Sequence, residues 1–121
     1  MRVLVVDDSA TMRMYLSSLL TEMDHRPCQA ADGRQALDLL EQAPSFHLAL
    51  VDWDMPVMDG AEFVKAVRAD PRFNSMKMIM VTARDTFEAV AQALANGADD
   101  FLMKPVDKDM LLEKFRVVGL Y

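Results

Sequence analysis

The sequence of 121 residues is poor in the side chains that form disulfides and zinc sites, because it contains one cysteine and two histidines. The single cysteine, Cys28, excludes an internal disulfide and favours a reducing compartment. His25 and His47 form no cluster with it of the kind that binds zinc. No apolar run approaches the ~18 residues of a membrane span, and the first residues resemble a strand rather than a signal peptide. We therefore expect a soluble, cytoplasmic protein that does not contact membranes.

Positive charge is also scarce, since 13 Lys and Arg face 19 Asp and Glu, for a net charge of −6. Nucleic-acid phosphates attract clusters of Lys and Arg, so we expect no direct binding of nucleic acid. A small group of acids can nevertheless bind a cation, and their distribution matters more than their total. Hydrophobic residues make up 52% of the chain, enough for a core. The length fits one domain, which we expect to span residues 1–121.

Five short apolar runs alternate with five helical patterns along the chain. The runs predict strands at Val3–Val6, Cys28–Ala30, Leu48–Val51, Met78–Val81 and Phe101–Met103. Apolar residues at helical spacing predict helices around Met12–Met23, Ala36–Leu40, Phe63–Val67, Val90–Leu94 and Leu111–Phe115. This alternation predicts an α/β fold with a parallel sheet and helices on both faces. The right-handed crossover rule and the size favour a doubly wound, flavodoxin-like fold with strand order 2-1-3-4-5.

Polar side chains follow four of the five predicted strands. Asp7 and Asp8 come directly after the first strand, and Asp52 follows the third. Thr82 follows the fourth strand and Lys104 the fifth. In such a sheet, ligands bind beyond the carboxyl ends of the strands, near the point where the strand order reverses. We therefore expect these side chains to converge on one site.

The chemistry of this group points to phosphoryl transfer. Three carboxylates held together cannot all ionise cheaply without a cation. Mg²⁺ prefers oxygen ligands and often completes its shell with phosphate oxygens. The Lys104 ammonium and the Thr82 hydroxyl each suit a phosphate oxygen. An aspartate with such neighbours is a precedented acceptor that forms an aspartyl-phosphate.

Four stretches around these residues carry a family resemblance. They are Val5–Ser9, Val51–Gly60, Met80–Ala83 and Gly97–Pro105. Together they resemble the receiver domains of two-component response regulators, in the expected order and over essentially the whole chain. Asp52-Trp53 and the stretch Ile79–Ala83 look most like the single-domain chemotaxis type.

The resemblance implies a phosphoacceptor and a metal site. Asp52 matches the residue that accepts a phosphoryl group. Asp8 and Asp52 match direct ligands of Mg²⁺, and Asp7 matches the acid that reaches the metal through water. The backbone carbonyl of Asp54 matches a further ligand.

The resemblance also implies a switch. Thr82 and Lys104 match the pair that contacts the phosphoryl group, and Phe101 matches the aromatic residue that turns when Thr82 moves. The peptide bond between Lys104 and Pro105 matches one that is usually cis. The donor would be a sensor histidine kinase or a phosphotransfer protein. The output protein or domain would bind the surface of the fourth helix, fifth strand and fifth helix.

Two positions depart from the chemotaxis type, which commonly has Asn two residues after the acceptor and Glu two residues after the Thr. Here these positions hold Asp54 and Arg84. We expect the two side chains to form an ion pair across the mouth of the site and to tune the rate of dephosphorylation. An exposed pair of this kind contributes on the order of 0–1 kcal/mol to stability.

Three other functions fit parts of the pattern. A small haloacid-dehalogenase-type phosphatase also uses an Asp-x-Asp pair, here Asp52 and Asp54, but that family places the pair on its first strand and usually adds a cap. In a flavin-binding module of the same fold, Asp7 and Asp8 would repel the phosphate. A receiver that has lost phosphorylation would not need the complete set of acids, Thr and Lys. We therefore expect a signalling switch that catalyses only its own phosphorylation and dephosphorylation.

Overall fold

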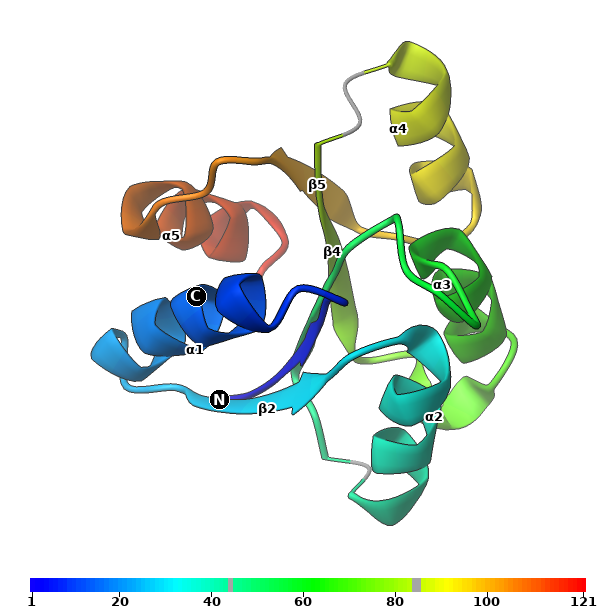
Figure 1. Ribbon diagram of the computed structural model, residues 1–121, viewed down its shortest axis with the longest axis horizontal. Helices are drawn as coiled ribbons and strands as arrows, with labels where there is room; N and C mark the ends of the chain where they lie inside the picture. The colour runs from blue at the N-terminus through cyan, green and yellow to red at the C-terminus, as the bar shows by residue number, and fades with distance from the viewer. Residues whose placement is uncertain (44, 84–85) are drawn as a thin grey trace.

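A computed structural model describes residues 1–43, 45–83 and 86–121, and within them the chain forms one parallel sheet of five strands (Figure 1). The strands are β1 (Arg2–Val6), β2 (Arg26–Ala30), β3 (Leu48–Val51), β4 (Lys77–Thr82) and β5 (Asp100–Met103). Their order in the sheet is β2-β1-β3-β4-β5, and each neighbouring pair is parallel. The predicted fold class and strand order are therefore confirmed.

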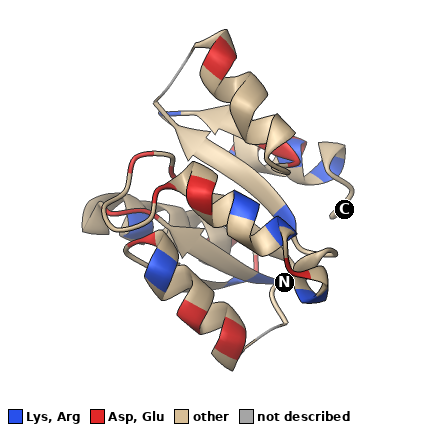
Figure 2. Cartoon of the chain, turned by 90° about the vertical axis from the view of Figure 1, so that its right-hand side faces the viewer, with Lys and Arg blue, Asp and Glu red and all other residues tan. Residues whose placement is uncertain are grey.

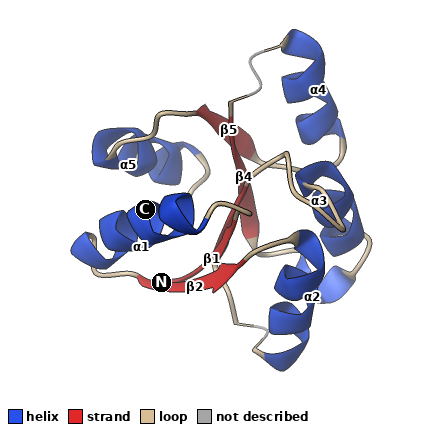
Figure 3. Ribbon diagram, viewed as in Figure 1, coloured by secondary structure: helices blue, strands red, loops and turns tan. Residues whose placement is uncertain are grey.

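The helices form one layer on each side of the sheet (Figure 3). They are α1 (Ala10–Glu22), α2 (Gly33–Gln42), α3 (Gly60–Arg68), α4 (Phe87–Ala95) and α5 (Lys108–Val117). Helices α1 and α5 cover one face, while α2, α3 and α4 cover the other. A short 3₁₀ helix, Pro71–Phe73, was not predicted; the Asp70 side chain accepts a hydrogen bond from Arg72 N and caps it. In the part of the chain that the structure describes, no helix is long and apolar enough to cross a membrane.

The alternation of side chains along the strands builds a core on each face. In β1, Leu4 and Val6 pack against the layer of α2, α3 and α4, while Val3 and Val5 pack against α1 and α5. Because β1 and β3 lie inside the sheet, they need apolar residues on both faces, which explains their continuous apolar runs. The edge strand β2 begins at Arg26, two residues earlier than predicted, and Pro27 is tolerated there because one side of an edge strand needs no pairing.

The segments after β1 and β5 lead within a few residues into helices that begin with a polar capping side chain. Ser9 accepts a hydrogen bond from Met12 N at the start of α1, and Asp107 accepts one from Met110 N at the start of α5. Such caps satisfy backbone donors that a helix leaves unpaired at its first turn. These two short, capped connections lie at the carboxyl end of the sheet, where the candidate site is also found.

Candidate functional site

Three acidic residues meet where β1 and β3 end side by side. Asp7 follows β1 and Asp52 follows β3, and the two strands pair through Val6 and Val51. Asp52 N donates to the carbonyl oxygen of Val6 over 2.8 Å, which continues the ladder into the site. Carboxylate oxygens of Asp7, Asp8 and Asp52 all lie within 4.8 Å of one another. The structure thus brings together three predicted residues in a geometry that can hold a metal ion. Figure 2 shows acidic residues, in red, in loops that join strands and helices.

Asp52 is the residue most perturbed by this arrangement. Its exposed fraction is 6%, and that of Asp7 is 1%, while Asp8 is exposed to solvent. Burial raises the pKa of Asp52 to about 6, and repulsion from Asp7 and Asp8 adds to the effect of burial. The Lys104 ammonium and the backbone N–H of Trp53 lower the same pKa but do not cancel these effects. A site that is short of positive charge in this way favours a cation.

Lys104 brings a positive charge to the acidic cluster. Its backbone N–H donates to the carbonyl oxygen of Thr82 over 2.9 Å, which anchors it beyond the end of β5. Its Nζ lies 3.1 Å from Asp7 Oδ2 and 3.5 Å from Asp52 Oδ1. The peptide bond between Lys104 and Pro105 is cis. The sequence predicts that Lys104 contacts a phosphate, but its pairing with Asp7 could not be predicted because the spacing of the strands does not reveal the direction of a side chain.

The loop after Asp52 approaches the acceptor closely. A Cβ atom at Gly60 would lie only 2.2 Å from the carbonyl oxygen of Asp52, so a larger residue would displace the backbone. Gly60 N donates to the carbonyl oxygen of Trp53 over 2.9 Å and closes the loop. Asp54 is exposed within this loop. Arg84, its expected partner, lies outside the described residues, so their pairing and its effect on dephosphorylation stay predictions.

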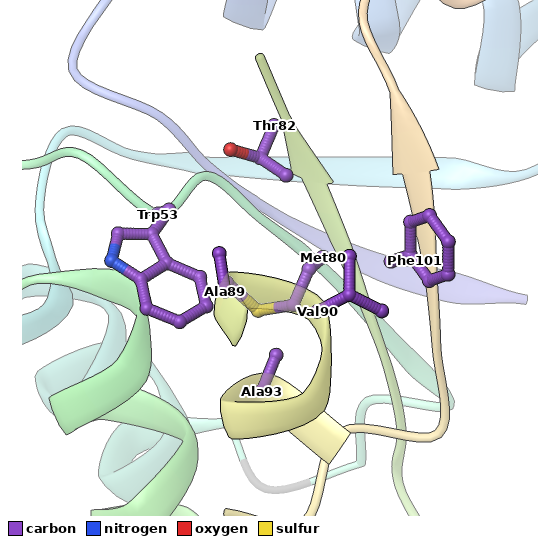
Figure 4. A pocket seen from close by; sticks show the side chains of 7 residues that line it. All are labelled: Trp53, Met80, Thr82, Ala89, Val90, Ala93 and Phe101. Atoms are coloured by element: carbon purple, nitrogen blue, oxygen red, sulfur yellow. The ribbon is translucent and has the colours of Figure 1, made fainter. Parts of the chain in front are cut away.

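An apolar cavity lies directly behind Thr82, the buried last residue of β4 (Figure 4). It is too narrow to admit a water molecule. The lining side chains are Trp53, Met80, Thr82, Ala89, Val90, Ala93 and Phe101. Trp53, the residue directly after Asp52, thus lines the same cavity as residues of α4 and β5, which are distant from it in the sequence.

Phe101 also contacts α5. The Lys114 Nζ lies 5.4 Å from the centre of the Phe101 ring and 3.0 Å from Asp100 Oδ1. The same oxygen accepts a hydrogen bond from Phe101 N over 2.8 Å. An ammonium at this distance attracts the face of an aromatic ring. Lys114 could not be predicted as part of this region, because nothing in the sequence of its own helix indicates that it reaches β5.

The chain is similar to known proteins over nearly its whole length. The family model of the response regulator receiver domain matches residues 3–116. A chemotaxis protein CheY homolog of Campylobacter jejuni is 39% identical over 119 residues, which cover 98% of this chain and 92% of the relative. Chemotaxis protein CheY1 of Helicobacter pylori is 36% identical over 98% of this chain and 96% of its own length.

Solved structures show the same likeness. Chemotaxis protein CheY4 of Vibrio cholerae superposes with a TM-score of 0.90 at 37% identity, over 97% of each chain. A probable two-component response regulator with a GGDEF domain superposes with a TM-score of 0.90 at 33% identity, over 98% of this chain and 48% of that protein. The arrangement therefore occurs both in chains of this length and within longer regulators.

Proposed function

The chain belongs to the response regulator receiver domain family of two-component signalling, and from this premise we propose that Asp52 accepts a phosphoryl group in a Mg²⁺-dependent reaction. One observation carries the proposal. The oxygens of Asp7, Asp8 and Asp52 lie within 4.8 Å of one another, with the Lys104 ammonium 3.5 Å from Asp52. The family match also favours a switch over the small phosphatase that shares an Asp-x-Asp pair.

The residues present fit a magnesium ion. All three clustered side chains offer oxygen ligands, and burial together with repulsion from Asp7 raises the pKa of Asp52, so that a cation beside it would be favourable. We infer that Asp8 and Asp52 would hold the ion directly, Asp7 would hold it through water, and the carbonyl of Asp54 would add an oxygen. When bound, Mg²⁺ neutralises charge on the phosphoryl oxygens.

The proposed reaction is an in-line transfer from a phosphohistidine. A carboxylate oxygen of Asp52 attacks the phosphorus, an O–P bond forms, and the N–P bond to the donor imidazole breaks with its electron pair leaving on nitrogen. With a pKa of about 6, most of Asp52 is ionised and nucleophilic at neutral pH. The Lys104 ammonium, now shared between Asp7 and Asp52, turns to a phosphoryl oxygen and stabilises its charge.

The cavity behind Thr82 supports the proposed switch. After transfer, the Thr82 hydroxyl moves to a phosphoryl oxygen, and the space that it leaves lies in the same cavity that Phe101 lines. Phe101 then turns inward and changes the surface formed by α4, β5 and α5. Water later attacks the aspartyl-phosphate and resets the switch.

The partners we propose are a sensor histidine kinase or phosphotransfer protein as donor and an output protein or domain as receiver of the signal. Exposed apolar side chains occur on α4 and α5, two elements of the proposed output surface. Phe87 at the start of α4 is 86% exposed, and Leu94 and Val117 are also exposed. These side chains are accessible to a protein partner.

The experiment that tests the function is incubation with acetyl phosphate and Mg²⁺ followed by intact-mass measurement. We expect one phosphoryl group per chain, bound to Asp52 and released by alkali or hydroxylamine, and no uptake when EDTA removes the metal. The matched control is Asp38→Asn, an exposed acid on α2 that pairs with Arg34 one helical turn away. A phosphoryl group mapped to another residue, or uptake independent of Mg²⁺, would contradict the proposal.

Titration with Mg²⁺ should change the fluorescence of Trp53, the only tryptophan in the sequence. Its indole is 8% exposed, and its backbone N–H donates to the Asp52 carboxylate, so a metal on Asp52 alters its surroundings. Replacing the exposed ligand, Asp8→Ala, should weaken Mg²⁺ binding by about tenfold or more, equal to about 1.4 kcal/mol. An unchanged midpoint in Asp8→Ala would remove this residue from the site, and Asp38→Asn again serves as the control.

A further inference from the structure

Tyr15 on α1 makes a long-range contact to which the proposed function gives no role. Its hydroxyl donates a hydrogen bond of 2.6 Å to the backbone carbonyl oxygen of Val106, 91 residues away in sequence. Val106 lies in the connection between β5 and α5, and its side chain is buried in the core under α1 and α5. Two residues before it stands Lys104, whose ammonium reaches the acidic cluster.

The connection from Lys104 to α5 is fastened at both ends. On the side of the sheet, Lys104 N donates to the carbonyl oxygen of Thr82 over 2.9 Å. On the side of α5, the Asp107 side chain accepts from Met110 N over 2.8 Å. The Tyr15 hydroxyl fastens the middle, at Val106, and attaches it to a different helix. The backbone that carries Lys104 is therefore tied to β4 on one side and to α1 on the other.

The same helix also fastens the partner of Lys104. Arg13 Nη1 donates to the backbone carbonyl oxygen of Asp7 over 2.7 Å. The backbone N–H of Ser9, which caps α1, donates to Asp7 Oδ1 over 2.9 Å. The other oxygen of this carboxylate, Oδ2, bonds the Lys104 Nζ at 3.1 Å. Helix α1 thus holds Asp7 through its first turns and the Lys104 connection through Tyr15.

We propose that Tyr15 is a positioning residue, which keeps the Lys104 ammonium where it can pass from Asp7 to a phosphoryl oxygen on Asp52. This inference rests on the proposed function of the site. Tyr15 is 43% exposed, so water would satisfy the Val106 carbonyl if the hydroxyl were removed. Water would not tie the connection to α1, however. Loss of the hydroxyl should therefore change the position of Lys104, although the Val106 carbonyl keeps a hydrogen bond.

The sharpest test is Tyr15→Phe, which keeps the ring and removes only the oxygen. The matched control is Tyr121→Phe. That hydroxyl also forms a hydrogen bond, to His25 Nε2, and Tyr121 is 53% exposed. It lies beside the residue that precedes β2, at the amino edge of the sheet and away from the acids. Both variants lose a hydrogen-bonded phenol oxygen, but only one loses a tie to the Lys104 connection.

At saturating acetyl phosphate and Mg²⁺, Tyr15→Phe should lower the phosphorylation rate constant by on the order of tenfold, because a reacting group is misplaced. Mg²⁺ affinity should stay within about twofold of wild type, since the proposed ligands are untouched. Tyr121→Phe should react like wild type. In a Lys104→Met background the effect of Tyr15→Phe should disappear, because the residue through which it acts is gone.

An equal rate loss in the Lys104→Met background, or none in the wild-type background, would overturn the proposal. A second readout does not depend on phosphorylation. The ammonium resonance of Lys104, followed by NMR on lysine labelled with ¹⁵N, should shift or broaden in Tyr15→Phe and not in Tyr121→Phe. If wild type takes up no phosphoryl group, the proposed function fails, while an unchanged Lys104 resonance would sink the role of Tyr15 separately.

Discussion

Replacing Asp52 with asparagine is expected to stabilise the metal-free protein at about pH 7.5 by up to about 3 kcal/mol, while it abolishes phosphoryl uptake. The two effects have one origin. Asp52 is 6% exposed and its carboxylate lies beside those of Asp7 and Asp8, so its charge is costly in the folded state. Asparagine has nearly the same shape without the charge, and it has no oxygen able to form an acyl phosphate.

The gain in stability should depend on pH in a direction that the pKa decides. Burial, with repulsion from Asp7, raises the pKa of Asp52 from 3.8 to about 6 in the folded protein. Between these values the folded state binds more protons than the unfolded state, so stability falls as the pH rises from about 4 to 6. At 1.36 kcal/mol for each tenfold change in proton affinity, the full cost above pH 6 is up to about 3 kcal/mol. Below about pH 4 the cost vanishes, and so should the advantage of Asp52→Asn.

Urea unfolding in EDTA at about pH 7.5 and about pH 4 measures this difference. The control Asp38→Asn alters an exposed pair with Arg34 and should change stability by no more than about 0.5 kcal/mol at either pH. A less stable Asp52→Asn at the higher pH, or an equal gain at both, would show that the Asp52 charge is not strained by its neighbours. Mg²⁺ should narrow the gap between wild type and variant, because it stabilises only a site with the intact acids.

The sequence sufficed to place Asp7 beside Asp52, because the placement depends only on topology. Apolar runs identify β1 and β3, the crossover rule and the size of the chain favour a strand order in which they are neighbours, and the first polar residue after each run falls at the same end of the sheet. Thr82 and Lys104 were located by the same argument, and the hydrogen bond between their backbones shows why it works. Residues at strand ends are ordered by the ladder itself.

Contacts made between helices and distant loops were beyond prediction. The tie from Tyr15 to Val106 and the approach of Lys114 to Phe101 both depend on how far α1 and α5 turn about their axes as they pack on the sheet. Periodicity says which face of a helix is apolar, but it does not say which exposed side chain meets which carbonyl or ring. Such contacts need the three-dimensional arrangement of the whole layer.

Lys104→Met should change the phosphorylation rate constant and the Mg²⁺ affinity in opposite directions, whereas general damage to the site would lower both. The phosphorylation rate constant should fall by on the order of 10²–10³-fold, because a fixed charge that stabilises the phosphoryl oxygens is lost. Mg²⁺ affinity should rise instead. The ammonium lies 3.1 Å from Asp7 and 3.5 Å from Asp52, so it neutralises the acids that hold the metal and repels a second cation. Removal of the ammonium should also raise the pKa of Asp52 above about 6, because Lys104 lowers this pKa in the wild-type protein.

The control for this prediction is Lys77→Met, at a half-buried lysine that begins β4 at the opposite edge of the sheet. It removes the same charge from the chain, so any change in Mg²⁺ affinity through net charge alone appears in both variants. The rate is measured with acetyl phosphate at saturating Mg²⁺, and the affinity by Trp53 fluorescence. A joint fall of rate and affinity in Lys104→Met would mean that Lys104 merely holds the acids in place. A rise in affinity with a slow reaction assigns its charge to the phosphoryl group, because only that role makes the two quantities move in opposite directions.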